Sequence, residues 1–183
     1  MHPVKGMLSP DSFIFAAEKT GMINEIGKTV LKLACREAVS WAVPARISVN
    51  VSPVQLGSKS FINTVQSVLA ETGLPANRLE LEVTESSLFS DRNNPIAILK
   101  KLRSLGVRIS IDDFGTGASS YSRLRTLDAD ILKIDGSFIR NILTDEFSRC
   151  AVRSFCEVAK LKNMEVVAEF VENEEIEKML ITM

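Results

Sequence analysis

Histidine is nearly absent from this chain of 183 residues, in which the only one is His2. Because imidazole is a common zinc ligand and is the base in Ser-His and Cys-His catalysis, the sequence argues against zinc sites and against both kinds of catalysis. Cysteine is scarce as well: Cys35, Cys150 and Cys156 form an odd set without C-x-x-C spacing. This pattern predicts reduced thiols in a cytoplasmic protein rather than a disulfide framework.

Long uncharged apolar runs and an apolar N-terminal segment are also missing, so we expect neither a membrane span nor a signal peptide. The formal net charge of −1 gives no electrostatic reason to expect binding to a nucleic acid polymer or to a membrane surface. With 45% apolar and 25% charged residues, the chain has ample material for a core. We therefore predict one globular domain over residues 1–183.

The order of apolar and polar segments predicts alternating strands and helices. Two helices come first, at 11–20, closed by Gly21, and at 23–41. The apolar face of the second helix should comprise Ile26, Val30, Leu33, Ala34 and Ala38. The predicted strands are 46–51, 79–83, 107–111, 131–134 and 165–168, and the helices after them 61–72, 95–105, 119–127, 146–161 and 173–180. Such alternation predicts right-handed crossovers and a parallel sheet.

Residue parity within the strands predicts how that sheet is folded. In the first strand Ile47, Val49 and Val51 alternate with polar residues, and the next two strands alternate in the same way. Open parallel sheets are usually apolar on both faces, because helices cover both. An α/β TIM-type (β/α) barrel, incomplete with about five parallel strands, reconciles one polar face with helical crossovers. An antiparallel sheet would alternate similarly, but the intervening helices disfavour it.

Polar residues follow at the ends of all five strands. They are Asn50, Glu82, Asp112, Lys133 and Glu169, with Asp113 at the start of the loop after the third strand. Active sites of (β/α) barrels lie at this end. Carboxylate and amide oxygens suit Mg²⁺ or Mn²⁺, and four carboxylates exceed what one divalent ion needs. The pattern predicts a two-metal site, with ions about 3.5–4 Å apart, that promotes displacement at a phosphoester.

Each of these residues also has a structural explanation. Asp112 and Asp113 can cap a helix, and the Asn50-Val-Ser52 segment can form a turn. Glu82 and Glu169 can be ion-pair partners of Arg108 or Lys133, and Lys133 can pair with Asp135. Gly115 and Gly117 alone are a weak signal for a phosphate-binding loop. For each residue taken alone the structural explanation is favoured, whereas their shared position on one rim favours a functional site. In such a site Lys133 would orient or deprotonate the attacking water. To deprotonate water, Lys133 would need a pKa well below the free value of about 10.4.

These residues lie in motifs that resemble the EAL family, bacterial phosphodiesterases that linearise cyclic di-GMP. The similar segments are Leu8-Ser-Pro-Asp-Ser-Phe-Ile14, Glu18-Lys-Thr-Gly21, Val49-Asn-Val-Ser52, Glu82-Val-Thr-Glu85, Asp112-Asp-Phe-Gly-Thr-Gly117, Leu132-Lys-Ile-Asp135 and Ala168-Glu-Phe-Val-Glu172. They correspond to the family patterns L-I-S-P-x-x-F-I, E-x-T-G, N-x-S, E-x-T-E, D-D-F-G-T-G, L-K-I-D and A-E-G-V-E. The resemblance runs along nearly the whole chain.

The resemblance implies roles for the rim residues. Asn50, Glu82 and Asp112 would bind the first Mg²⁺ or Mn²⁺ ion, whereas Asp112, Asp113 and Glu169 would bind the second. Lys133 would serve the attacking water in the conversion of cyclic di-GMP to linear pGpG. The further substrate or loop residues would be Phe114, Gly115, Thr116, Gly117, Asp135 and Glu172. The implied partners are cyclic di-GMP and either a second copy of the chain or the regulatory domains of a larger protein.

The chain also departs from the family pattern. Its Met1-His-Pro3 start resembles the end of the E-A-L-x-R-W-x-H-P segment, so the signature Glu and Arg would precede residue 1. The strand that carries the Q-G-Y motif of the family would follow Met183. Phe170 stands where the family pattern has Gly, and Ala118 stands where the family usually has Tyr. We therefore expect a partial domain with open edges at the strands 46–51 and 165–168, and absent or impaired catalysis.

Three other interpretations remain. The chain can be a non-catalytic cyclic di-GMP receptor or a protein-binding module on the same scaffold. It can be a fragment of a larger sensor protein, which would complete the site elsewhere. The weakest alternative is a different metal-dependent barrel hydrolase, because the combination of E-x-T-E, D-D-F-G-T-G and L-K-I-D motifs fits few other families.

Overall fold

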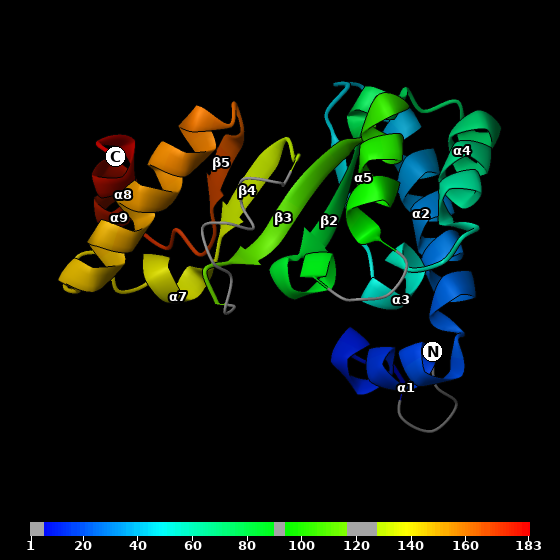
Figure 1. Ribbon diagram of the computed structural model, residues 1–183, viewed down its shortest axis with the longest axis horizontal. Coiled ribbons are helices and arrows are strands. Elements are labelled where there is room, and N and C mark those ends of the chain that lie inside the picture. The colour runs from blue at the N-terminus through cyan, green and yellow to red at the C-terminus, as the bar shows by residue number, and fades with distance from the viewer. Residues whose placement is uncertain (1–5, 90–93, 117–127) are drawn as a thin grey trace.

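The computed structural model describes residues 6–89, 94–116 and 128–183 (Figure 1). Five strands form one parallel sheet in the order β1-β2-β3-β4-β5. They are β1 (Ile47–Asn50), β2 (Leu79–Thr84), β3 (Arg108–Phe114), β4 (Ile131–Ile134) and β5 (Glu165–Ala168). The predicted α/β architecture with five parallel strands is confirmed.

Helices connect the strands. The α-helices are α1 (Ile14–Thr20), α2 (Ile23–Val39), α3 (Pro53–Leu56), α4 (Phe61–Thr72), α5 (Pro95–Ser104), α7 (Gly136–Ile139), α8 (Glu146–Leu161) and α9 (Glu174–Ile181). Short 3-10 helices are η1 (Pro10–Ser12), η2 (Ala76–Arg78) and η3 (Glu85–Phe89). The predicted helix 119–127, Gly117, Ala118 and the Met1-His-Pro3 segment lie outside the described residues.

The helices cover one face of the sheet. Figure 1 shows α2, α4 and α5 beside β1–β3, and α8 and α9 beside β4 and β5. Leu79, Leu81 and Val83 of β2 are completely buried in the core under these helices. The other face carries the polar residues of the same strands, as parity predicts for the inside of a barrel. In the described residues no helix is both long and apolar enough to cross a bilayer.

The buried face of α2 matches the predicted one only in part: Ala38 is buried and Ala34 packs against the core, as expected. Val30 and Leu33 are 47% and 60% exposed, whereas Leu31 and Cys35 are buried. The buried stripe is rotated by about one residue around the helix, since it runs from Ile23 through Leu31 and Cys35 to Ala38. The helix also ends at Val39, two residues before the predicted end. The apolar pattern allowed either stripe, and packing against β1 and α4 selects one of them.

The two edge strands have one neighbour each among the described residues, so the expected open edges are present. Val166 and Val167 of β5 are 38% and 43% exposed. Unpaired strand edges invite pairing with another chain. Within the described part of the chain, β5 is the more weakly covered strand, because all of its residues except Ala168 are exposed.

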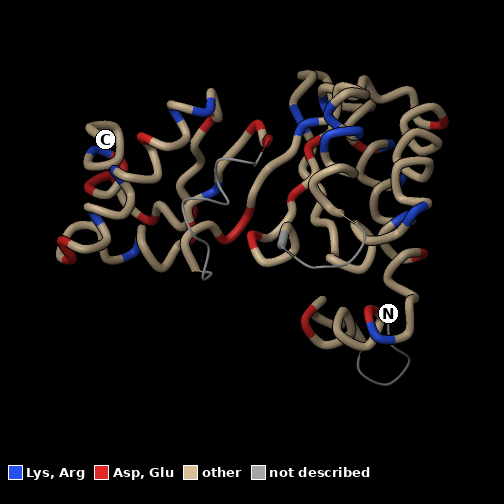
Figure 2. Tube along the Cα trace, viewed as in Figure 1, with Lys and Arg blue, Asp and Glu red and all other residues tan. Residues whose placement is uncertain are grey.

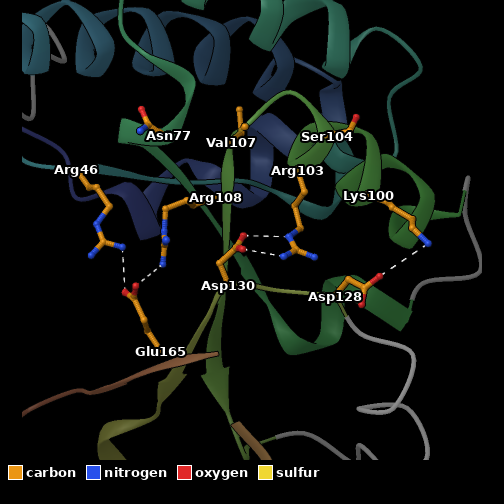
Figure 3. A pocket seen from close by; sticks show the side chains of 11 residues that line it. Arg46, Asn77, Lys100, Arg103, Ser104, Val107, Arg108, Asp128, Asp130 and Glu165 are labelled. Carbon is orange, nitrogen blue, oxygen red and sulfur yellow. Dashed lines mark hydrogen bonds and ion pairs between the residues drawn. The ribbon is translucent and has the colours of Figure 1, made fainter. Parts of the chain in front are cut away.

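An ion-pair network at the N-terminal ends of the strands joins the two edges of the sheet (Figure 3). Arg46, just before β1, contacts Glu165 of β5 through Nη1 and Oε2 at 3.0 Å. Arg108 of β3 contacts Oε1 of the same carboxylate at 2.9 Å. Nearby, Arg103 of α5 holds Asp130 at 2.8 Å. These groups line an open pocket of about 690 Å³. Glu165 thus ties both edges of the sheet to its central strand.

We predict that Glu165→Gln lowers the free energy of unfolding at neutral pH by at most about 1 kcal/mol, because exposed ion pairs are weak. The hydrogen bond from Arg46 and the charge of Arg108 lower the pKa of Glu165. Because its pKa is lower in the folded state, Glu165 stabilises the fold at pH values above its pKa in the unfolded chain, which is about 4.3. This contribution is lost as pH falls through the pKa of Glu165 in the folded state.

Urea titrations at a series of pH values measure this dependence. The difference between the parent and Glu165→Gln should shrink as pH falls below about 4. Glu174→Gln is the matched control, since Glu174 forms a more exposed pair with Lys178 within α9. Equal effects of the two substitutions at neutral pH would contradict a role for Glu165 in joining the edges.

Candidate metal site at the carboxyl ends of the strands

The end of β3 brings two consecutive carboxylates to one rim. In a regular strand Asp112 and Asp113 would point to opposite faces. Here the pairing of β3 with β4 is irregular between Ile111 and Phe114, and Asp113 adopts a left-handed conformation with φ of 53°. Such a bulge re-aims side chains, and Asp tolerates the left-handed region better than most residues. Both carboxylates therefore lie on the rim.

Glu169 completes an acidic cluster. It follows β5 directly, and one carboxylate oxygen each of Asp112, Asp113 and Glu169 lies within 4.8 Å of the others. Figure 2 shows acidic positions at the end of β3, on the side where the loops after the strands gather. Three oxygen donors at this spacing fit a hard divalent cation, so the donor set matches Mg²⁺ or Mn²⁺.

Lys133 of β4 lies at the centre of these carboxylates. Its Nζ is 2.7 Å from Oδ1 of Asp112 and 2.7 Å from Oε1 of Glu169. A third contact, of 3.3 Å, joins Nζ to Oε1 of Glu82. The side chain is only 14% exposed. The structural reading of Lys133 as an ion-pair partner of Glu82 and Glu169 is therefore confirmed, and Asp112 belongs to the same network.

The pKa values reflect this crowding of charge. Burial and, next, the charge of Asp112 raise the pKa of Asp113. Burial also raises the pKa of Glu82, against the attraction of Lys133. For Lys133 itself, burial opposes the charged form, but hydrogen bonds to Asp112 and Glu169 and the charge of Glu82 outweigh it and raise the pKa well above its ordinary value. Lys133 is thus an ammonium in this arrangement, and a basic role would need neutralised neighbours.

The remaining predicted ligands are neighbours in the sheet. Asn50 of β1 pairs in register with Glu82 of β2, so both lie at the same level of the rim. Thr84 of β2 in turn pairs with Asp112. Asn50 is exposed, and its side chain forms no hydrogen bond with the described residues. The structure thus joins Glu82 to the cluster through Lys133 and leaves Asn50 beside it.

The residues predicted for the loops have mainly structural contacts. The sequence left open an ion pair between Asp135 and Lys133, but the structure does not form it. The side chain of Asp135 instead caps α7 by accepting a hydrogen bond from the backbone N of Ser137 at 2.9 Å. Phe114 is buried edge-to-face against Phe155, at 4.9 Å between ring centroids. Thr116 donates to the carbonyl of Asp113 at 2.9 Å. Glu172 is exposed and outside the cluster.

Gly115 and Ser52 have clear backbone roles. Gly115 has φ of 100°, and a Cβ there would lie 2.7 Å from Phe138, so only glycine fits this turn. Ser52 caps α3 in a capping box with Gln55, which confirms the turn alternative for this residue. Arg108 contacts Glu165 rather than Glu82 or Glu169, so that proposed pairing is wrong.

Two carboxylates that support the site were not among the predicted residues. Glu85 is buried, and its Oε2 accepts from the backbone N of Gly115 at 3.0 Å, which holds the loop after Asp113. Glu18 of α1 accepts from the hydroxyl of Ser52 at 2.6 Å and so braces the turn after Asn50. Their only sequence signals were the second Glu of the E-x-T-E segment and the Glu of E-x-T-G, which do not reveal these partners.

We predict that Lys133→Met lowers the free energy of unfolding by about 3 kcal/mol without divalent cations, because buried carboxylates lose their counter-charge. Mn²⁺ should restore much of the loss, since a cation that binds only the folded state stabilises it. Thermal melts with and without Mn²⁺ measure both effects. The control, Lys178→Met, removes an exposed pair and should change little. A loss that Mn²⁺ leaves unchanged would contradict a metal-binding cluster.

The sequence and fold also match those of known proteins. The EAL domain family matches residues 1–183. The chain is 45% identical over 174 residues to an uncharacterized signaling protein of Caulobacter vibrioides, which covers 95% of this chain and 22% of that protein. It is 42% identical over 175 residues to the cyclic di-GMP phosphodiesterase NbdA of Pseudomonas aeruginosa. This match covers 93% of this chain and 22% of NbdA. The chain thus spans under a quarter of the length of these relatives.

A solved structure shares the fold. The PaMucR phosphodiesterase, determined in complex with c-di-GMP, superposes with a TM-score of 0.89 at 37% sequence identity. The match covers 99% of this chain and 75% of that one. This likeness confirms an α/β fold of TIM-barrel type.

Proposed function

Because the chain belongs to the EAL domain family, we propose that it forms the metal-binding rim of a cyclic di-GMP phosphodiesterase. The observation that carries this proposal is the cluster of Asp112, Asp113 and Glu169 around Lys133, with carboxylate oxygens within 4.8 Å. A relative that is 42% identical is a cyclic di-GMP phosphodiesterase. Hydrolysis of cyclic di-GMP to linear pGpG with Mg²⁺ or Mn²⁺ is the activity that these groups support.

Each rim residue has a role in this reaction. Asn50, Glu82 and Asp112 would hold one cation, and Asp112, Asp113 and Glu169 the other. Bound cations would polarise the phosphodiester and lower the pKa of water. Lys133 lies between the two ligand sets, 2.7 Å from both Asp112 and Glu169. Its ammonium would orient the attacking water and attract the phosphate, while Glu85 holds the Gly115 backbone in place.

A non-catalytic cyclic di-GMP receptor is the second candidate. It is favoured by Phe170, which stands beside Glu169 where the similar family segment has Gly, and by the ion pairs that keep Lys133 protonated. Such a receptor would bind the dinucleotide with a cation and release it unchanged. Binding and hydrolysis therefore have to be measured separately.

The test is incubation with cyclic di-GMP and Mn²⁺, with chromatography of the nucleotides and calorimetry of binding. As a phosphodiesterase the chain should form pGpG, and Asp112→Asn should lower the rate by at least about 100-fold, because it weakens both proposed cation sites. Glu174→Gln, an exposed pair partner in α9, is the control and should leave the rate unchanged. Binding without pGpG would favour the receptor, and absence of both would contradict the proposal.

A further inference from the structure

Phe170, the residue after Glu169, has an unusual backbone conformation. Its φ of 55° lies in the left-handed region, which residues with a Cβ enter at a steric cost. In the described part of the chain three other non-glycine residues share it, namely Asn94, Asp113 and Asn163. Asn and Asp tolerate this region, whereas a bulky aromatic residue does not. Other contacts must therefore hold Phe170 there.

The side chain of Phe170 lies against α7. A Cβ added to Gly136, the first residue of α7, would overlap the ring and lie 2.8 Å from Cγ of Phe170. Arg140 directly follows α7, and its Cζ lies 3.8 Å from the ring centroid, within cation–π distance. The ring thus packs on the bare backbone of Gly136 and under the guanidinium of Arg140, although half of the residue is exposed.

These contacts anchor the chain on both sides of Glu169. On one side, the backbone N of Glu169 donates to the carbonyl of Ile134 at 3.2 Å. On the other, Phe170 packs on Gly136, only two residues after Ile134. β5 is an edge strand, and all of its residues except Ala168 are exposed. The carboxylate of Glu169 then reaches Lys133 at 2.7 Å.

We propose that Phe170 is a positioning residue for Glu169, with Gly136 as the surface that receives its ring. Phe170 fixes the main chain of Glu169 against the segment from Ile134 to Gly136, and so fixes its carboxylate on the rim. The metal-related part of this inference rests on the proposed function, while the position of the main chain does not. A glycine at residue 170 would relieve the backbone strain but release the anchor.

The first measurement is amide hydrogen exchange at Glu169 without metal, because its N–H donates to Ile134 and reports the main-chain position directly. Phe170→Gly should reduce the protection of this amide about tenfold or more, and Phe170→Tyr should retain it. Asn163→Gly is the matched control, since Asn163 has φ of 54° at the opposite end of β5. It relieves similar strain and should leave Glu169 unchanged. Unaltered protection in Phe170→Gly would overturn the proposal.

The second measurement is Mn²⁺ affinity by calorimetry. Substitution of a residue that orients a metal ligand typically costs about 10–100-fold in metal affinity. Phe170→Gly should therefore weaken Mn²⁺ binding by about tenfold or more, whereas Phe170→Tyr and Asn163→Gly should bind Mn²⁺ like the parent. Equal Mn²⁺ affinity of the parent and Phe170→Gly would refute the positioning role. A parent chain that binds no Mn²⁺ would instead refute the proposed function, and exchange at Glu169 would then decide the inference alone.

Gly136→Ala tests the same contact from the other side. The added Cβ should displace the ring and lower the protection of Glu169 as Phe170→Gly does. In the Phe170→Gly background the same substitution should have no further effect, because the ring is gone. If the two losses instead add independently, Gly136 does not receive the ring.

Discussion

Mutual repulsion of carboxylates at one end of a parallel sheet is the constraint on which the rest of the site depends. Asp112 and Asp113 lie in β3 and Glu169 directly follows β5, which is not a neighbour of β3, yet one oxygen of each carboxylate lies within 4.8 Å of the others. Burial and, next, the charge of Asp112 raise the pKa of Asp113, because a poorly solvated site and a nearby like charge both disfavour the ionised carboxylate. Lys133, on the strand between them, supplies the compensating charge in the described structure. The same excess of negative charge suits the cluster to divalent cations.

The two ends of the sheet divide stability and chemistry between them. At the N-terminal ends, Glu165 contacts Arg46 and Arg108, and each group in this network has an opposite charge close by. At the carboxyl ends, acidic groups outnumber Lys133. This division is typical of (β/α) barrels, in which the loops after the strands carry the site. Strand parity places both networks on the same face of the sheet, because residues an even number apart on one strand, such as Arg108 and Asp112, face the same side.

Two of the four left-handed non-glycine residues in the described chain lie at the acidic cluster. They are Asp113, itself a proposed metal ligand, and Phe170, which directly follows the proposed ligand Glu169. Such conformations persist where surrounding contacts hold them, and they are frequent at functional sites. Glu85 holds the loop after Asp113 through Gly115, while Gly136 and Arg140 hold Phe170. The geometry of the rim therefore depends on contacts from η3 and α7 as much as on the ligands themselves.

The sequence by itself determined the strands, their parallel order and the residues at their ends, because alternation and helix-capping signals are properties of single segments. β4 and β5 have the predicted bounds. The buried stripe of α2 was predicted only in part: Ala38 is buried as expected, but Val30 and Leu33 fit an apolar face in the sequence as well as the buried Leu31 and Cys35 do. Only the tertiary structure decided that face, the bulge that turns Asp113, and the partners of Glu85 and Glu165. Arg46 and Glu165 are 119 residues apart, and no local pattern encodes a contact that the curvature of the whole sheet creates.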